Sequence, residues 1–204
     1  MSKREKKYLE LELRDYPAVL SQASSFYDVG YKIVFRYLRL KEAGKWQSTD
    51  NSLLAVAAAN MMVAFELYFK SLILLTKGEY ETGHQLKTLF QELPDEIKVT
   101  LDKKFEILKA TAKGNFPIIK RNAPVYIESY NPWTQNISLS EFLDIHSDGF
   151  IEWRYQFQTR FTKTIYADFS LMHVLYLCIV DVLKNLPVIR EDEVIFEPNI
   201  KNHQ

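Results

Sequence analysis

The segment "SLLAVAAANMMVAFELYFKSLILL", from Ser52 to Leu75, is the longest apolar stretch of the chain and decides the fold. It is long enough to cross a membrane, but Asn60, Glu66 and Lys70 interrupt it. Placing one charged side chain at the centre of a bilayer costs on the order of 3 kcal/mol. A helix that is apolar on most sides is otherwise found in the middle of a soluble protein. We therefore expect a central helix over Ser52–Thr76 in a soluble helical bundle without membrane contact.

A second apolar run, "FSLMHVLYLCIVDVL" (Phe169 to Leu183), is too short to cross a bilayer and contains His173 and Asp181. It belongs to a helix that we expect from about Thr159 to Asn185, because Pro187 stops it. Apolar residues recur along it at spacings of four and three: Ile165, Phe169, Met172, Tyr176, Ile179, Leu183 and Leu186. Its second face is apolar too, which predicts another core helix.

The first helix is expected from about Pro17 to Ala43. Its stripe of small and apolar residues consists of Val19, Ala23, Phe26, Gly30, Ile33, Tyr37 and Leu40. A glycine inside such a stripe removes the side chain where two helices meet. Gly30 therefore predicts the close approach of a neighbouring helix.

Shorter helices are expected between the two core helices. Thr82 and Gln85 match a capping box for a helix of two to three turns, and Ser138 and Glu141 match another. The second box is flanked by Ile137 and Phe142 at the positions of a hydrophobic staple. A further helix should begin around Pro94, since proline fits the first turn of a helix.

From about residue 115 to 137 the helical period is lost. Pro117, Pro124 and Pro132 interrupt this segment, and "APVYIESYNPW" could include a short extended piece. We therefore predict an all-α, up-and-down helical bundle over residues 17–187 with one irregular aromatic and proline-rich insertion. A charged arm (1–16) precedes the bundle, and a tail (188–204) follows it.

The composition restricts the class of protein. The 204 residues are 47% hydrophobic and 25% charged with a formal net charge of zero, so the total charge does not signal a nucleic-acid binder. The single cysteine, Cys178, rules out an internal disulfide, and the start of the chain lacks the apolar core of a secretory signal. The six glycines form no phosphate-binding loop, and Cys178 and the four histidines lack the spacing of zinc ligands. We expect a cytoplasmic protein without a metal or cofactor.

Four polar residues mark one candidate site. Glu66 and Lys70 lie one turn apart on the central helix and, if buried, need further partners. Arg154 in "IEWRYQFQ" (Ile151 to Gln158) is a candidate partner for Glu66, because a guanidinium matches a carboxylate bidentately. His84 should lie in the first turn of its helix, away from the apolar side chains of that helix. It is either a general base or a polar contact that docks the helix.

A basic row on the first helix marks a second candidate site. Lys32, Arg36 and Arg39 follow one another at helical spacing and are flanked by Tyr31 and Phe35. Such a row can bind phosphates beside aromatic platforms, or it can be an ordinary solvated helix face.

Three segments, taken together and in order, resemble the HEPN-domain superfamily: "AFELYFKSLILL" (Ala64 to Leu75), "GHQLKTLFQELP" (Gly83 to Pro94) and "FIEWRYQF" (Phe150 to Phe157). The resemblance covers about Ser52 to Leu186 and implies a small all-α bundle that is often dimeric. Members include RNA-cleaving toxins, antiviral defence ribonucleases and nucleotide- or RNA-binding modules without catalysis. The positions that match are Glu66, Lys70, Gly83, His84, Trp153, Arg154 and Tyr155.

The ribonuclease members of this superfamily share an arginine followed four to six residues later by a histidine. This chain has no such pair: after Arg154 and Arg160 the first histidine is His173. We therefore expect a binding module for RNA, nucleotide or a protein partner, in a bacterial stress or defence system and as a homodimer. One alternative is a divergent, metal-independent ribonuclease with His84 as base and Arg154 as phosphate clamp. The other is a purely structural homodimer.

Overall fold

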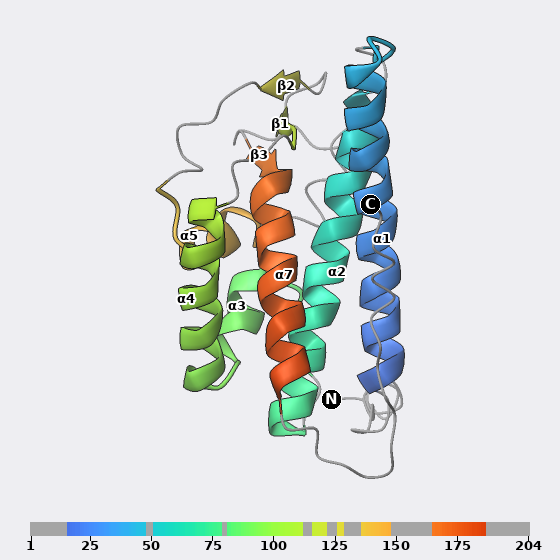
Figure 1. The fold of residues 1–204 in the computed structure, drawn as a ribbon. Helices are drawn as coiled ribbons and strands as arrows, with labels where there is room; N and C mark the ends of the chain where they lie inside the picture. The colour runs from blue at the N-terminus through green and yellow to red at the C-terminus, as the bar shows by residue number, and fades with distance from the viewer. Residues whose placement is uncertain are drawn as a thin grey trace.

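The computed structural model describes residues 16–47, 51–78, 81–111, 116–121, 126–128, 136–147 and 165–186. Its helices in these ranges are α1 (Tyr16–Glu42), α2 (Asn51–Lys77), α3 (Leu86–Gln91), α4 (Asp95–Thr111), α5 (Leu139–Ile145) and α7 (Phe169–Asn185). In Figure 1, α1 and α4 run in one direction, and α2 and α7 run in the opposite direction. The structure confirms the predicted all-α, up-and-down bundle.

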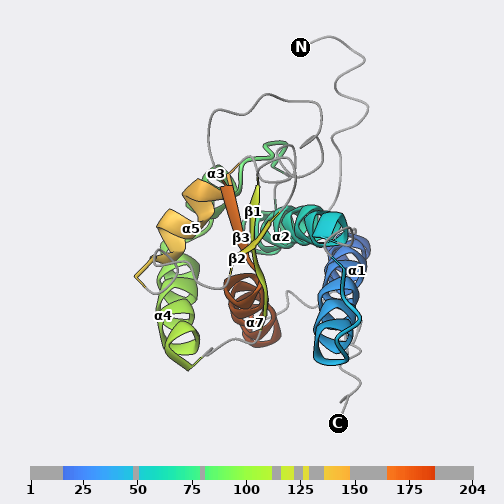
Figure 2. The same cartoon turned by 90° about the horizontal axis from the view of Figure 1, so that it is seen from above.

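Helix α2 is the core helix that its sequence predicts. Its buried side chains lie on all sides of its axis, and α1, α3 and α7 pack against it. Among the described helices, α2 alone has the length and apolar composition of a membrane span. Most of that apolar surface is covered by the bundle, as expected for a core helix. Figure 2 shows α2 beside α1, with α7 and α4 following across the bundle.

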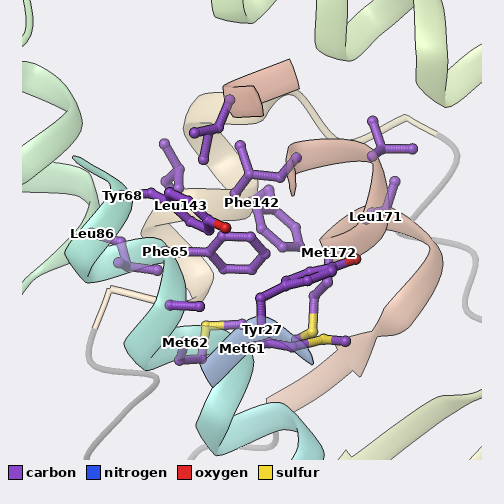
Figure 3. Close-up of a cluster of buried hydrophobic side chains, with 14 of the residues drawn as sticks. Tyr27, Met61, Met62, Phe65, Tyr68, Leu86, Phe142, Leu143, Leu171 and Met172 are labelled. Atoms are coloured by element: carbon purple, nitrogen blue, oxygen red, sulfur yellow. The ribbon is translucent and has the colours of Figure 1, made fainter. Parts of the chain in front are cut away.

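The core is built by several helices at once. Figure 3 shows Tyr27 of α1, Phe65 of α2, Leu86 of α3, Phe142 of α5 and Met172 of α7 in one cluster of buried side chains. Phe65, Phe142 and Met172 are almost completely shielded from solvent. The short helices α3 and α5 are each held in the bundle by three buried apolar side chains.

Gly30 marks a close contact between α1 and α2. A Cβ atom added at Gly30 would lie 2.9 Å from the backbone oxygen of Ala57 and 2.8 Å from Cγ of Met61. This confirms the predicted close approach. The buried face of α1 is turned slightly from the predicted stripe: Tyr27 and Val34 are buried, whereas Phe26 and Ile33 are half-buried.

The last helix begins later than predicted. Instead of a helix from Thr159, residues Ile165–Asp168 form strand β3, and α7 begins at Phe169. Strand β3 pairs with β1 (Ile118–Arg121), which pairs with β2 (Tyr126–Glu128) inside the predicted insertion. The four-residue spacing from Ile165 to Phe169 looks helical in the sequence, but the pairing with β1 takes Ile165 into the sheet. Asp168 then caps α7 through Oδ1, which accepts from the N–H groups of Ser170 and Leu171.

The two predicted capping boxes have different outcomes. The box at α5 is confirmed, because Ser138 Oγ accepts from the Glu141 N–H and Glu141 Oε2 accepts from the Ser138 N–H. The box at Thr82 is wrong: α3 begins at Leu86 with Gln85 as its N-cap, and no side chain caps it. Helix α3 is therefore shorter than predicted, and His84 lies in the loop that precedes it.

Candidate functional site

Glu66, Lys70 and His84 meet at one carboxylate oxygen. Lys70 Nζ donates to Glu66 Oε1 over 2.8 Å, and Nδ1 of His84 lies 2.8 Å from the same oxygen. The side chains of Lys70 and Glu66 are only 3% and 10% exposed, whereas that of His84 is 69% exposed. A buried carboxylate thus joins a buried ammonium to an imidazole at the surface.

The loop before α3 places His84 over Glu66. Within this loop the Gly83 N–H donates to Oε1 of Glu81 over 2.9 Å. At its end, Leu86 is buried, and its N–H donates to the backbone oxygen of Ser147. Lys87 adds an ion pair with Asp144 of α5. The contacts of Leu86 and Lys87 therefore anchor the end of the loop next to His84.

The contact with Glu66 determines which ring nitrogen of His84 is available. A carboxylate beside an ammonium accepts hydrogen bonds, so Nδ1 of the neutral imidazole carries the proton. Nε2 then has a free lone pair on a ring that is mostly exposed. Among the described residues, no second group bonds to His84. The arrangement fits a proton acceptor or a nucleophile whose ring is oriented by a carboxylate.

The basic row of α1 lies at the surface, as predicted. Lys32, Arg36 and Arg39 are exposed, and within the described ranges none of them is paired with a carboxylate. Phe35 beside them is 45% exposed, and its ring stacks on that of Tyr31 with centroids 6.4 Å apart. Three free cations thus border an aromatic ring that is open to solvent.

The two predicted sites are not one site. Ala57 faces α1 at Gly30, and Glu66 follows Ala57 after about two and a half helical turns, so it lies on the opposite side of α2. On α1, Arg39 follows Gly30 after about two and a half turns as well, so the basic row faces away from α2. The basic row and His84 therefore lie on opposite sides of the α1–α2 pair.

Three predicted site residues, Trp153, Arg154 and Tyr155, lie outside the described residues. The contact expected between Arg154 and Glu66 therefore stays a prediction. What the structure places on Glu66 is Lys70 and His84. Glu66, Lys70 and His84 all match the three sequence segments described above. The sequence did not predict the contact between Glu66 and His84, because these two residues are 18 positions apart in the chain.

A second polar cluster joins α1 to α7. The hydroxyl oxygen of Tyr27 lies 2.6 Å from Nδ1 of His173. The Tyr27 ring stacks on that of Tyr176, with the ring centroids 3.7 Å apart. Burial lowers the pKa of His173 below its usual value, and burial together with Tyr176 raises the pKa of Tyr27 well above 10. The hydroxyl of Tyr27 thus gives Nδ1 of the half-buried His173 a hydrogen-bond partner between α1 and α7. Tyr27 was missed because Phe26 fits the helical stripe equally well.

Cys178 is a packing residue of the core. It is fully buried in α7, and burial raises the pKa of its thiol to about 12. A thiol with this pKa is protonated at neutral pH and is a poor nucleophile.

No protein-family model, curated protein or solved structure matches this chain. The resemblance to the HEPN superfamily therefore stays a prediction from the three sequence segments. The functional proposals below rest on the positions and contacts of the described residues.

Proposed function

We propose that this protein is a cytoplasmic helical-bundle module that binds single-stranded RNA or nucleotides through the outer face of α1. The observation that carries the proposal is the row of unpaired Lys32, Arg36 and Arg39 next to the exposed ring of Phe35. Cations that are free of acidic partners can neutralise phosphates and release their counterions. An exposed aromatic ring can stack a base.

Spacing supports a phosphate chain as the ligand. Lys32, Arg36 and Arg39 extend over about two turns of α1, or roughly 10 Å along its axis. This length is enough for two or three phosphates of a flexible strand. Phe35 lies on the edge of the row, where an unstacked base beside such phosphates would meet it. The ring is supported from behind by Tyr31, which packs against Phe116 and His173.

The test measures binding of a fluorescently labelled single-stranded RNA at several salt concentrations. We expect the double variant Arg36→Glu/Arg39→Glu to weaken binding at low salt by on the order of tenfold or more, because two attractive charges become repulsive. The slope of log K against log salt should become less steep by at least about 1.4, since each phosphate contact contributes about 0.7 for a single strand. Phe35→Ala should weaken binding with little change in the slope.

The matched control is Lys103→Glu/Lys184→Glu, which changes the net charge by the same amount on α4 and α7. Both lysines are exposed and unpaired in the described part of the chain. The control should bind RNA nearly as the unchanged protein does. Equal losses in both double variants would mean that only the total charge matters and would refute a site on α1. Absence of RNA or nucleotide binding at low salt would refute the proposed function.

A further inference from the structure

We propose that His84 is a phosphoryl-acceptor site, with its Nε2 atom as the nucleophile. The site lies on the side of the α1–α2 pair opposite to the basic row, so this proposal does not depend on RNA binding. Its chemistry is set by two contacts and one exposed ring: Nδ1 of His84 contacts Glu66, Lys70 contacts Glu66, and the imidazole of His84 is mostly exposed.

The carboxylate of Glu66 directs the reaction to Nε2. When Nδ1 donates its proton to Oε1, the lone pair of the neutral ring is on Nε2. The ring becomes positively charged as Nε2 forms a new bond, and the carboxylate 2.8 Å from Nδ1 stabilises that charge. Glu66 is thus a positioning residue for the imidazole, and His84 is the residue that reacts.

Lys70 makes the site compatible with an anionic donor. A lone buried carboxylate would repel a phosphate that approaches the ring. The ammonium of Lys70 lies 2.8 Å from the same carboxylate oxygen and offsets its negative charge. Because Lys70 is buried, its charge stays at this position and is poorly screened by solvent. A phosphoryl donor can therefore reach Nε2 without opposing charge from Glu66.

A phosphoramidate or an acyl phosphate can donate the phosphoryl group to Nε2 of His84. With phosphoramidate, the Nε2 lone pair forms an N–P bond, while the P–N bond of the donor breaks and its electron pair leaves with ammonia. Nδ1 keeps its proton, so the product is a phosphoimidazolium beside the Glu66 carboxylate. With an acyl phosphate, a carboxylate leaves instead. No metal, oxidant or reductant takes part in either reaction.

The other described histidines lack this combination. Nδ1 of His173 bonds to the hydroxyl of Tyr27 inside the aromatic cluster, and burial lowers the pKa of this histidine. His146 is buried and packs edge-on against Phe142. His84 alone among the described histidines combines an exposed ring with a carboxylate at Nδ1.

The test treats the full chain with potassium phosphoramidate near neutral pH and maps the product by fragmentation mass spectrometry and ³¹P NMR. We expect His84 to be phosphorylated before any other histidine and at Nε2. Glu66→Gln should slow the reaction by about tenfold or more, as expected on loss of a carboxylate that orients a reacting histidine. His84→Gln should abolish it.

Glu66→Gln also removes a buried ion pair with Lys70, so the variant could fail to fold. The unchanged protein gives an independent result: ¹⁵N NMR of labelled histidine should show the proton of neutral His84 on Nδ1. A proton on Nε2, or equal phosphorylation of several histidines, would overturn the proposal. Cleavage of RNA in EDTA that is lost in His84→Gln, without any N–P bond, would also overturn it and would assign Nε2 as the proton acceptor of a ribonuclease.

Discussion

At the scale of single residues, Gly30 sets how closely the two longest helices can approach. An alanine there would place its Cβ atom 2.9 Å from the Ala57 carbonyl oxygen, which belongs to the backbone of α2 and cannot turn aside. The nearby Met61 side chain is flexible and can move, but the carbonyl can move only with its helix. We therefore expect Gly30→Ala to force α1 and α2 apart.

The expected cost of Gly30→Ala is a net loss of about 1–2 kcal/mol in the free energy of unfolding. Overpacking costs about 1–3 kcal/mol, and the better helix propensity of alanine returns up to about 1 kcal/mol. Urea unfolding measures the difference. Gly83→Ala is the control, because its added Cβ would meet only Glu81 Oε1 at 3.4 Å. A Gly30→Ala protein as stable as the unchanged one would show that the helices are not in close contact.

At the scale of elements, the start of α7 depends on a single carboxylate. Asp168 Oδ1 accepts from the N–H groups of Ser170 and Leu171 at 2.8 and 3.2 Å, and the residue is buried. We expect Asp168→Ala to lower the free energy of unfolding by about 0.5–2 kcal/mol, the range typical of lost N-caps. Asp168→Asn keeps an acceptor oxygen and should lose clearly less. Equal losses in the two variants would mean that the cap does not stabilise α7.

The starts of α5 and α7 show which local signals in the sequence are sufficient to place the start of a helix and which are not. Ser138 and Glu141 gave the start of α5 correctly, because both partners of a capping box lie within one turn. The start of α7 was misplaced because strand β3 is fixed by pairing with β1, some 45 residues earlier in the chain. The signal that could have found it is Asp168 itself, an N-cap residue directly before the apolar run. A strand as short as β3 has too few residues to show the alternating pattern of a strand in the sequence. The helical spacing of the residues that follow therefore dominates the prediction.

At the scale of the whole molecule, the sequence named the residues of both candidate sites but not their arrangement. The three sequence segments contain Glu66, Lys70 and His84, but the contact between Glu66 and His84 exists only because the loop before α3 lies over α2 in the folded chain. Likewise, the basic row was found from its spacing, whereas its position opposite His84 depends on which face of each helix is buried. The expected homodimer and the role of Arg154 stay predictions.

This arrangement predicts that the two candidate sites act independently. Sites without shared contacts change binding and stability additively. We expect Arg36→Glu/Arg39→Glu to leave the rate of His84 phosphorylation unchanged within about twofold, and His84→Gln to leave RNA affinity unchanged. Both variants can be measured in both assays at the same ionic strength. A large loss of RNA affinity in His84→Gln would show that one strand reaches around the α1–α2 pair, and the two surfaces would then have to be treated as one continuous site.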